Sequence, residues 1–359
     1  MVIEQYTVTT QRYNFPQPTM DTVLPRRFLE QSIQSLRQVH NEAFEQNQQS
    51  LQYPTSMENP FSIALKPHPI LLIPRTQQTL VVAVDTSTMK IGETCTGLII
   101  AVRGATVWKQ NRHYRYTRMG PFIFHITEDN KNDVFNSLEK AYFNVSQTAN
   151  CRFAPTTLQM PTRIASLFER WMQSSLAKTA ENAIILFDGS LTAGTIDTPA
   201  KRMHEILDAA RRRGNTVLAF SKGTSLRVSG RLITDQLPEH EPPYLLETSN
   251  LKLKPPTVLL GEVYVARLNR ARIAFRLDID REISESGQLE AVEKLVGNDL
   301  YLQSYPETLR LAHILCTFTA NEVLAMQHFA KRKYGIQLVN RPDMHRLLFG
   351  PFGRGESHA

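Results

Sequence analysis

Hydrophobic residues form three short runs in the first third of the chain, each about as long as a β-strand. The runs cover 80–84, 97–102 and 122–126. They are rich in Val, Ile and Phe, which favour strands because their side chains pack well on a pleated surface. Their close spacing along the chain favours antiparallel neighbours over parallel strands joined through a helix. The pattern therefore predicts an antiparallel meander.

Beyond residue 160, helical periodicity alternates with continuous apolar runs. Hydrophobic residues recur at helical intervals after Pro161, a favourable residue for the first turn of a helix. Apolar runs at 183–187 and 216–220 are typical of buried parallel strands, and a helix is expected between them at about 199–213. This order predicts an α/β fold of the RNase H-like type, a mixed sheet in which an antiparallel meander is extended by parallel strands and flanked by helices.

Both ends of the chain are expected to add helices. Hydrophobic positions at helical intervals in 26–49 indicate an amphipathic helix that either packs on the main domain or docks a partner. A later strand and two further helices are predicted at about 273–278, 289–296 and 307–331. The chain is divided into an N-terminal arm with its helix, a main domain and a tail, at 1–60, 61–340 and 341–359.

The composition is that of a globular protein with a modest basic excess. The 359 residues are 42% hydrophobic, and 41 Lys and Arg against 34 Asp and Glu give a net charge of +7, which suits a polyanionic partner. No secretory leader or membrane-spanning stretch is recognised, so a cytoplasmic protein is expected. Cys95, Cys151 and Cys316 lie far apart with no histidine recognised at zinc-ligand spacing, so reduced thiols are expected and structural zinc is not.

Two aspartates follow apolar runs and carry the strongest chemical signal. Asp85 comes after Val82-Ala83-Val84, and Asp188 after Ile185-Leu186-Phe187. Each aspartate alone is also explained as a cap of the turn that follows it. A carboxylate at the end of a buried strand is costly to desolvate unless a cation or donors compensate it. Two of them on adjacent strands predict a site for Mg²⁺ or Mn²⁺ that activates water against a phosphate.

The motifs around these aspartates resemble the ordered motif set of the NurA family of DNA-end-processing nucleases. The resemblance spans about Leu80 to Phe329, and it is carried by V-A-V-D-T-S, F-E-R-W, I-I-L-F-D-G-S-L, A-F-S-K-G-T-S, F-R-L-D-I-D and Y-P-E-T-L-R-L-A-H. It implies a 5′ to 3′ exonuclease and single-strand endonuclease that usually prefers Mn²⁺. It also implies a homodimer that works with the hexameric HerA translocase in DNA double-strand break repair.

Carried over residue by residue, the resemblance implies a site built on both aspartates. Asp85 matches the first metal-binding aspartate, although the family's usual D-G-S reads Asp-Thr-Ser here, and Asp188 matches the second closely. Glu169 takes the place of a helical glutamate, and His313 that of a histidine near the metal. Metal binding is thus expected of Asp85, Asp188, Glu169 and His313, with catalysis shared by these four and Lys222.

Other polar residues have both functional and structural interpretations. Lys222 follows an apolar run, so its ammonium either reaches the scissile phosphate or lies in solvent. Asp278 matches a polar position lining the family's site, while Asp280 lies on the same strand face and competes with it. A set of basic and aromatic residues suits phosphate contact and base stacking, or else a solvated hairpin. It comprises Arg103, Trp108, Lys109, Arg112, Tyr114, Arg115, Tyr116 and Arg118.

Two other functions compete with a nuclease. Asp85-Thr86-Ser87 also looks like the first phosphate loop of actin-like ATPases and sugar kinases, with Asp188-Gly189-Ser190 imitating the second, although no glycine-rich adenosine segment follows. The third hypothesis is a catalytically inactive DNA-binding or translocase-docking module. The presence of both Asp85 and Asp188 argues against it.

Overall fold

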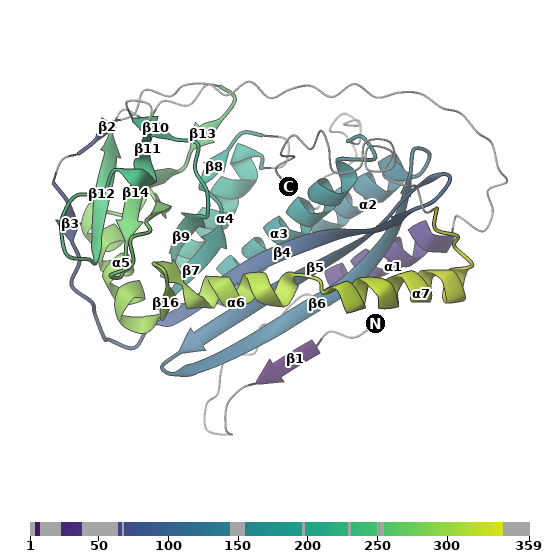
Figure 1. The fold of residues 1–359 in the computed structure, drawn as a ribbon, viewed down its shortest axis with the longest axis horizontal. Helices are drawn as coiled ribbons and strands as arrows, with labels where there is room; N and C mark the ends of the chain where they lie inside the picture. Colours follow the sequence, from purple (N-terminus) through teal and green to yellow (C-terminus); the bar gives the residue numbers. More distant parts are fainter. Residues whose placement is uncertain are drawn as a thin grey trace, which may run out of the picture.

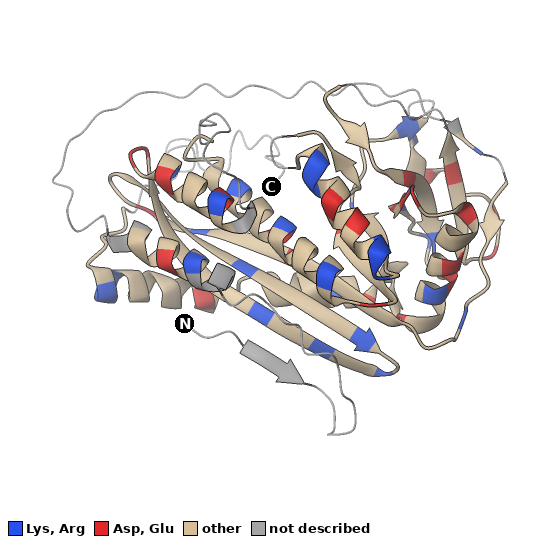
Figure 2. Ribbon diagram, turned by 180° about the vertical axis from the view of Figure 1, so that it is seen from behind, with Lys and Arg blue, Asp and Glu red and all other residues tan. Residues whose placement is uncertain are grey.

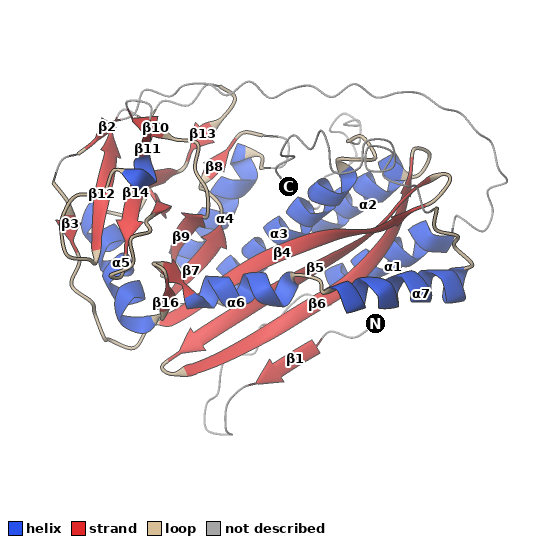
Figure 3. Ribbon diagram, in the orientation of Figure 1, coloured by secondary structure: helices blue, strands red, loops and turns tan. Residues whose placement is uncertain are grey.

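One large mixed sheet dominates the computed structural model, which describes residues 4–7, 23–37, 64–66, 68–143, 155–195, 198–228, 231–249, 251 and 255–339. Within these residues the sheet has 11 strands (Figures 1 and 3). In spatial order they are β1 (Glu4–Thr7), β6 (His113–Thr127), β5 (Gly97–Gln110), β4 (Leu80–Glu93), β7 (Ala183–Asp188), β9 (Thr216–Ser221), β15 (Phe275–Asp280), β14 (Gly261–Arg267), β12 (Tyr244–Ser249) and β2 (Ala64–Leu65), with β3 (Ile70–Leu71) also paired to β12.

Smaller elements surround this sheet. Three two-stranded pairs join β10 (Arg227–Val228) to β11 (Arg231–Leu232), β8 (Thr192–Ala193) to β13 (Val258–Leu259), and β16 (Tyr301–Leu302) to β17 (Tyr305–Pro306). The helices are α1 (Val23–Arg37), α2 (Lys131–Phe143), α3 (Met160–Thr179), α4 (Ala200–Arg212), α5 (Glu285–Asn298), α6 (Glu307–Cys316), α7 (Ala320–Tyr334) and the short 3₁₀ turn η2 (Ile233–Asp235). No helix among the described residues is long and apolar enough to cross a membrane.

The centre of the sheet confirms the predicted RNase H-like arrangement. Strands β4, β5 and β6 form the antiparallel meander, and β7 and β9 extend it as parallel neighbours of β4 and of each other. The meander strands are much longer than the apolar runs that predicted them. Strand β4 continues to Glu93, so Asp85 lies inside the strand. The expectation that Asp85 follows the end of a strand is therefore wrong. This continuation is possible because β5 keeps pairing with β4 after β7 has ended.

Helices cover both faces of the sheet. Alternate residues of β4 point to opposite sides: Val82 and Val84 pack with α1 to α4, and Val81 and Ala83 with α5 and α6. Helix α7 packs farther along β4 and β5, through Met326, Ala330 and other buried residues. Figure 1 shows α6 and α7 following one another across the long strands.

The N-terminal helix is confirmed over Val23–Arg37 and packs on the main domain. Its buried Phe28 contacts Phe122, Phe124 and Phe168, with ring centroids 4.5, 4.8 and 5.0 Å apart. The rest of the predicted helix, 38–49, and the tail from 340 onward lie outside the described residues.

The single helix predicted over 307–331 is wrong, because the chain breaks between α6 and α7. Thr319 begins α7 with a capping box: its side chain accepts from the Glu322 backbone N–H, and the Glu322 carboxylate accepts from the Thr319 N–H. This reciprocal pair satisfies N–H groups that a helix start leaves without partners. The sequence T-A-N-E carries the signature of this cap.

Gly104 allows α3 to lie close to the sheet. A Cβ atom at this position would lie 2.4 Å from Met172 Sδ and 2.7 Å from Phe168 Cε1, both on α3. Across the β4–β5 pair, Gly104 is the register partner of Thr86, the residue after Asp85. The missing side chain therefore sets how near α3 comes to the strand that carries Asp85.

Gly104→Ala is expected to lower the free energy of unfolding by about 1–3 kcal/mol, the usual effect of overpacking a dense core. Gly223→Ala is the matched control, because a Cβ there meets no atom within 4 Å. Urea denaturation of both variants measures the difference. Equal midpoints for Gly104→Ala and the wild type would show that α3 is not held this tightly.

Candidate active site

The sheet brings Asp85 and Asp188 side by side. In the parallel pair of β4 and β7, Val84 is the register partner of Phe187, and each aspartate is the next residue of its strand. Side-chain alternation places both on the face covered by α6, the face to which Ala83 and Leu186 also point. The two predicted aspartates, far apart in the chain, thus meet on one face.

Asp85 is buried, and each of its carboxylate oxygens has a hydrogen-bond partner. Its exposed fraction is 5%. Oδ1 accepts the Thr86 backbone N–H at 2.7 Å, and Oδ2 lies 2.7 Å from Nδ1 of His313 on α6. The His313 side chain is 45% exposed, so the contact between His313 and Asp85 opens to solvent. The structure therefore places His313 beside Asp85.

Asp188 is the second of the two aspartates that meet in the sheet. Its Oδ2 accepts from Lys222 Nζ at 2.6 Å, and the Tyr305 hydroxyl lies 3.5 Å from Oδ1. Lys222 directly follows β9, the parallel neighbour of β7, which explains how its ammonium reaches Asp188. Burial raises the pKa of Asp188, the hydrogen bond from Lys222 opposes that shift, and the charge of Asp85 adds to it.

Gly189 turns the chain immediately after Asp188. Its φ of 103° lies in the region that side chains disfavour, and its N–H donates to the Phe220 carbonyl at 2.8 Å. The Asp-Gly pair of the sequence thus ends β7 abruptly and leaves the Asp188 carboxylate at the strand end.

Glu169 approaches from α3, and its charge is coupled to both aspartates. Its carboxylate accepts from Gln173 Nε2 at 2.9 Å. Burial raises the pKa of Glu169 to about 7; Arg170 opposes the shift, and the charges of Asp85 and Asp188 add to it. The half-buried glutamate is thus electrostatically coupled to both aspartates, and we call Asp85, Asp188 and Glu169 the acid cluster.

The donor set of the acid cluster suits a hard divalent cation. Carboxylate oxygens are the ligands that Mg²⁺ and Mn²⁺ take in proteins. Lys222 and His313 each pair with one aspartate. The raised pKa of Glu169 comes mainly from burial, and the charges of Asp85 and Asp188 add to it. A cation near these carboxylates would favour their charged forms.

Asp278 lies on the other side of the sheet from the aspartate pair. Leu277 and Ile279 pack on the α6 face, so Asp278 between them points to the opposite face. Its carboxylate accepts from Arg276 at 2.6 and 2.7 Å and from the Leu191 N–H at 2.9 Å. Asp278 therefore stabilises the loop after Asp188 through its hydrogen bond with the Leu191 N–H. Its rival Asp280 is paired with Arg211.

Three basic residues of the β5–β6 hairpin are engaged within the protein. Arg103 and Arg118 both reach the Glu322 carboxylate, and they donate to the Thr317 and Leu315 carbonyls at the end of α6. Lys109 donates to the Asn298 carbonyl at the end of α5. Basic positions do follow the long strands (Figure 2), but these three hold helices against the sheet instead of forming a phosphate-binding surface.

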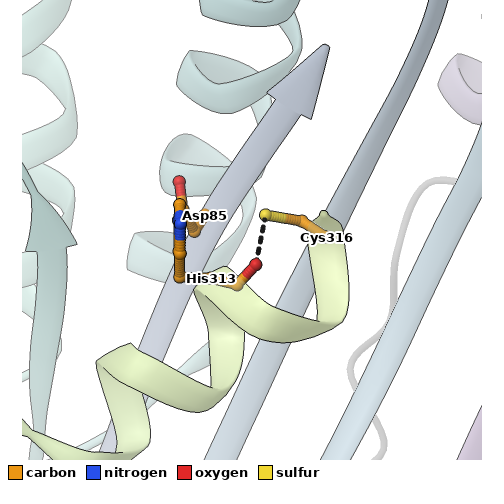
Figure 4. A group of neighbouring side chains, drawn as sticks. All are labelled: Asp85, His313 and Cys316. Atoms are coloured by element: carbon orange, nitrogen blue, oxygen red, sulfur yellow. Dashed lines mark hydrogen bonds and ion pairs between the residues drawn. The ribbon is translucent and has the colours of Figure 1, made fainter. Parts of the chain in front are cut away.

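Sequence reasoning missed Tyr305 and Cys316. Tyr305 precedes α6 in the Y-P-E-T motif, and Lys222 Nζ lies 5.9 Å from its ring centroid. Cys316 lies one helical turn after His313, a spacing that the sequence analysis failed to recognise as a ligand pair. In the structure, ligand atoms of Asp85, His313 and Cys316 lie within 4.8 Å of one another (Figure 4).

Comparisons with known proteins gave structural matches alone. No protein-family model matches the sequence, and no curated protein does. The NurA nuclease from Sulfolobus solfataricus aligns with a TM-score of 0.42 and 14% identity, over 74% of this chain and 88% of that chain. Endonuclease V from Bacillus subtilis gives 0.31 and 13% over 74% and 88%, and human ENDOV gives 0.33 and 12% over 70% and 86%.

Glu169→Gln is expected to stabilise the metal-free protein more as the pH rises. The carboxyl is protonated in both states below its ordinary pKa of 4.5, and between there and about 7 the unfolded chain loses the proton first. The wild type therefore loses stability across this window, whereas the glutamine variant does not. In a chelator, the variant should gain about 1–3 kcal/mol at about pH 8 and much less near pH 5.

Chemical denaturation across that pH range provides the measurement. The matched control is Glu239→Gln, a change at an exposed glutamate that should leave the pH dependence as it is. A stability difference between Glu169→Gln and the wild type that stays constant with pH would contradict the raised pKa of Glu169.

Proposed function

We propose that this protein is a divalent-metal-dependent nuclease that hydrolyses phosphodiester bonds in DNA ends or single strands. The observation that carries the proposal is the meeting of Asp85 and Asp188 on one face, with Glu169, His313 and Lys222 coupled to them. A turn-capping role explains each aspartate separately. It does not explain why the buried Asp85 and the partly exposed Asp188 lie side by side in the sheet.

Each residue has a task that its position suits. Asp85 and Asp188 would hold the ion, with Glu169 as an additional ligand or an orienting acceptor for water. Mn²⁺ or Mg²⁺, when bound, supplies Lewis-acid polarisation of the phosphate and lowers the pKa of bound water. Lys222 at the end of β9 would turn its ammonium from Asp188 toward a phosphate oxygen. His313, exposed beside Asp85, would orient or protonate a phosphate oxygen or ligate the ion.

The strand that carries Asp85 speaks against the competing ATPase hypothesis. A phosphate loop of the actin-like kind requires a hairpin close to its aspartate. Here β4 continues from Asp85 to Glu93, and the turn to β5 comes only at Thr94, whose N–H donates to the Gly97 carbonyl. The first predicted phosphate loop is therefore regular strand.

Asp188→Asn is expected to lower DNA cleavage by about a hundredfold or more, because it removes a charged metal ligand from the acid cluster. Asp129→Asn, at an exposed aspartate, is the matched control and should cleave as the wild type does. Single- and double-stranded DNA with Mn²⁺ or Mg²⁺ serves as substrate, and a chelator should abolish cleavage. Wild-type rates in Asp188→Asn, or ATP binding without cleavage in the wild type, would refute the nuclease proposal.

The finer part of the proposal follows the resemblance to the NurA motif set. It comprises 5′ to 3′ exonuclease and single-strand endonuclease activities, a preference for Mn²⁺, homodimerisation and cooperation with a HerA-type hexameric translocase in double-strand break repair. DNA labelled at its 5′ end is expected to release the label as the first product. Early release of a 3′ label instead would reverse the proposed polarity while leaving the nuclease assignment intact.

A further inference from the structure

We propose that Asp85, His313 and Cys316 form a binding site for a thiophilic divalent cation such as Zn²⁺, and that this ion competes with the catalytic one. The competition rests on the proposed nuclease function, whereas the binding site does not. The three residues come from one strand and one helix, β4 and α6, and Figure 4 shows them gathered where α6 crosses β4.

The geometry needs little rearrangement to accept an ion. His313 and Cys316 are three residues apart on α6, so both side chains lie on the same side of the helix. Asp85 Oδ2 already lies 2.7 Å from His313 Nδ1, and Cys316 Sγ lies 3.2 Å from the His313 carbonyl oxygen. One ion would replace the direct contact between Asp85 and His313. The exposed edge of His313 provides the entry path, since Cys316 and Asp85 are buried.

The ligand chemistry distinguishes this ion from the one held by the acid cluster. Thiolate and imidazole select zinc and other borderline or soft metals, whereas Mg²⁺ and Ca²⁺ take oxygen ligands. Three protein ligands and one water would complete the tetrahedral coordination usual for zinc. Binding replaces the proton of the Cys316 thiol, which passes to solvent. The proton that His313 Nδ1 donates to Asp85 is displaced too, and Nε2 carries the remaining proton of the neutral imidazole. No redox partner is required.

Asp85 is a ligand in both proposed metal sites, so the two ions are expected to compete. An ion held by Asp85, His313 and Cys316 takes one of the two aspartates from the acid cluster and occupies the histidine proposed to face the phosphate. Zinc is therefore expected to inhibit cleavage supported by Mn²⁺ in competition with it. Asp188 is not among the three ligands, so its removal leaves the zinc site complete.

Co²⁺ is the direct probe, because its visible and near-ultraviolet absorption reports tetrahedral geometry and thiolate ligation. The full-length Cys95→Ser/Cys151→Ser protein keeps Cys316 as its single cysteine. Titration of this protein should give the thiolate-to-cobalt band at one equivalent, and Zn²⁺ should displace it. Adding Cys316→Ser or Cys316→Ala should abolish the band and weaken Zn²⁺ binding about tenfold or more. Two replacements are used because either could disturb the buried position; circular dichroism identifies a folded variant.

Asp188→Asn separates the two proposals. In the background whose single cysteine is Cys316, this variant should lose cleavage yet keep the cobalt band. A missing band in the folded background protein, or a band that survives loss of Cys316, would overturn the zinc site whatever the nuclease assay shows. A cobalt band without any DNA cleavage would uphold the site and refute the nuclease function. Zinc inhibition unchanged by removal of Cys316 would overturn the competition.

Discussion

The candidate site depends on one constraint: neighbouring strands hold two carboxylates of like charge side by side, the buried Asp85 and the partly exposed Asp188. Charges of like sign in a poorly solvated place are costly unless cations or donors face them. Lys222, His313 and the Thr86 N–H each supply part of that compensation. Glu169 adds a third carboxyl whose pKa is raised to about 7, mainly by burial and further by the charges of Asp85 and Asp188. A divalent ion would stabilise the charged forms of these carboxyl groups.

Residues distant from the acid cluster maintain its geometry. Arg103 and Arg118 bind the last carbonyls of α6, where cations also favour the helix dipole, and thereby hold His313 over β4. Gly104 lets α3 come close enough to bring Glu169 toward the aspartates from the opposite face. Asp278 fixes Leu191 in the loop after β7. The hairpin's basic residues and Asp278 thus serve the site by positioning other parts, in place of the direct contacts that the sequence suggested.

The same site offers two ligand sets of different chemistry. Asp188 and Glu169 extend Asp85 into an oxygen-rich set on one side, while His313 and Cys316 extend it into a set with nitrogen and sulfur on the other. Asp85 belongs to both, so under our proposal an ion bound by one set competes with an ion bound by the other. The identity of the bound ion would then decide whether the site cleaves DNA.

The sequence by itself determined the order and type of the central elements. Buried strands and amphipathic helices require different spacings of hydrophobic residues, and these spacings can be recognised in the sequence. It also located Asp85 and Asp188, whose charges contrast with the apolar runs before them. Strand lengths, the break at Thr319 and the opposite face of Asp278 depend on pairing partners and capping geometry. The roles of Arg103, Arg118 and Cys316 were decided by tertiary structure alone, since each depends on residues that only folding brings into contact.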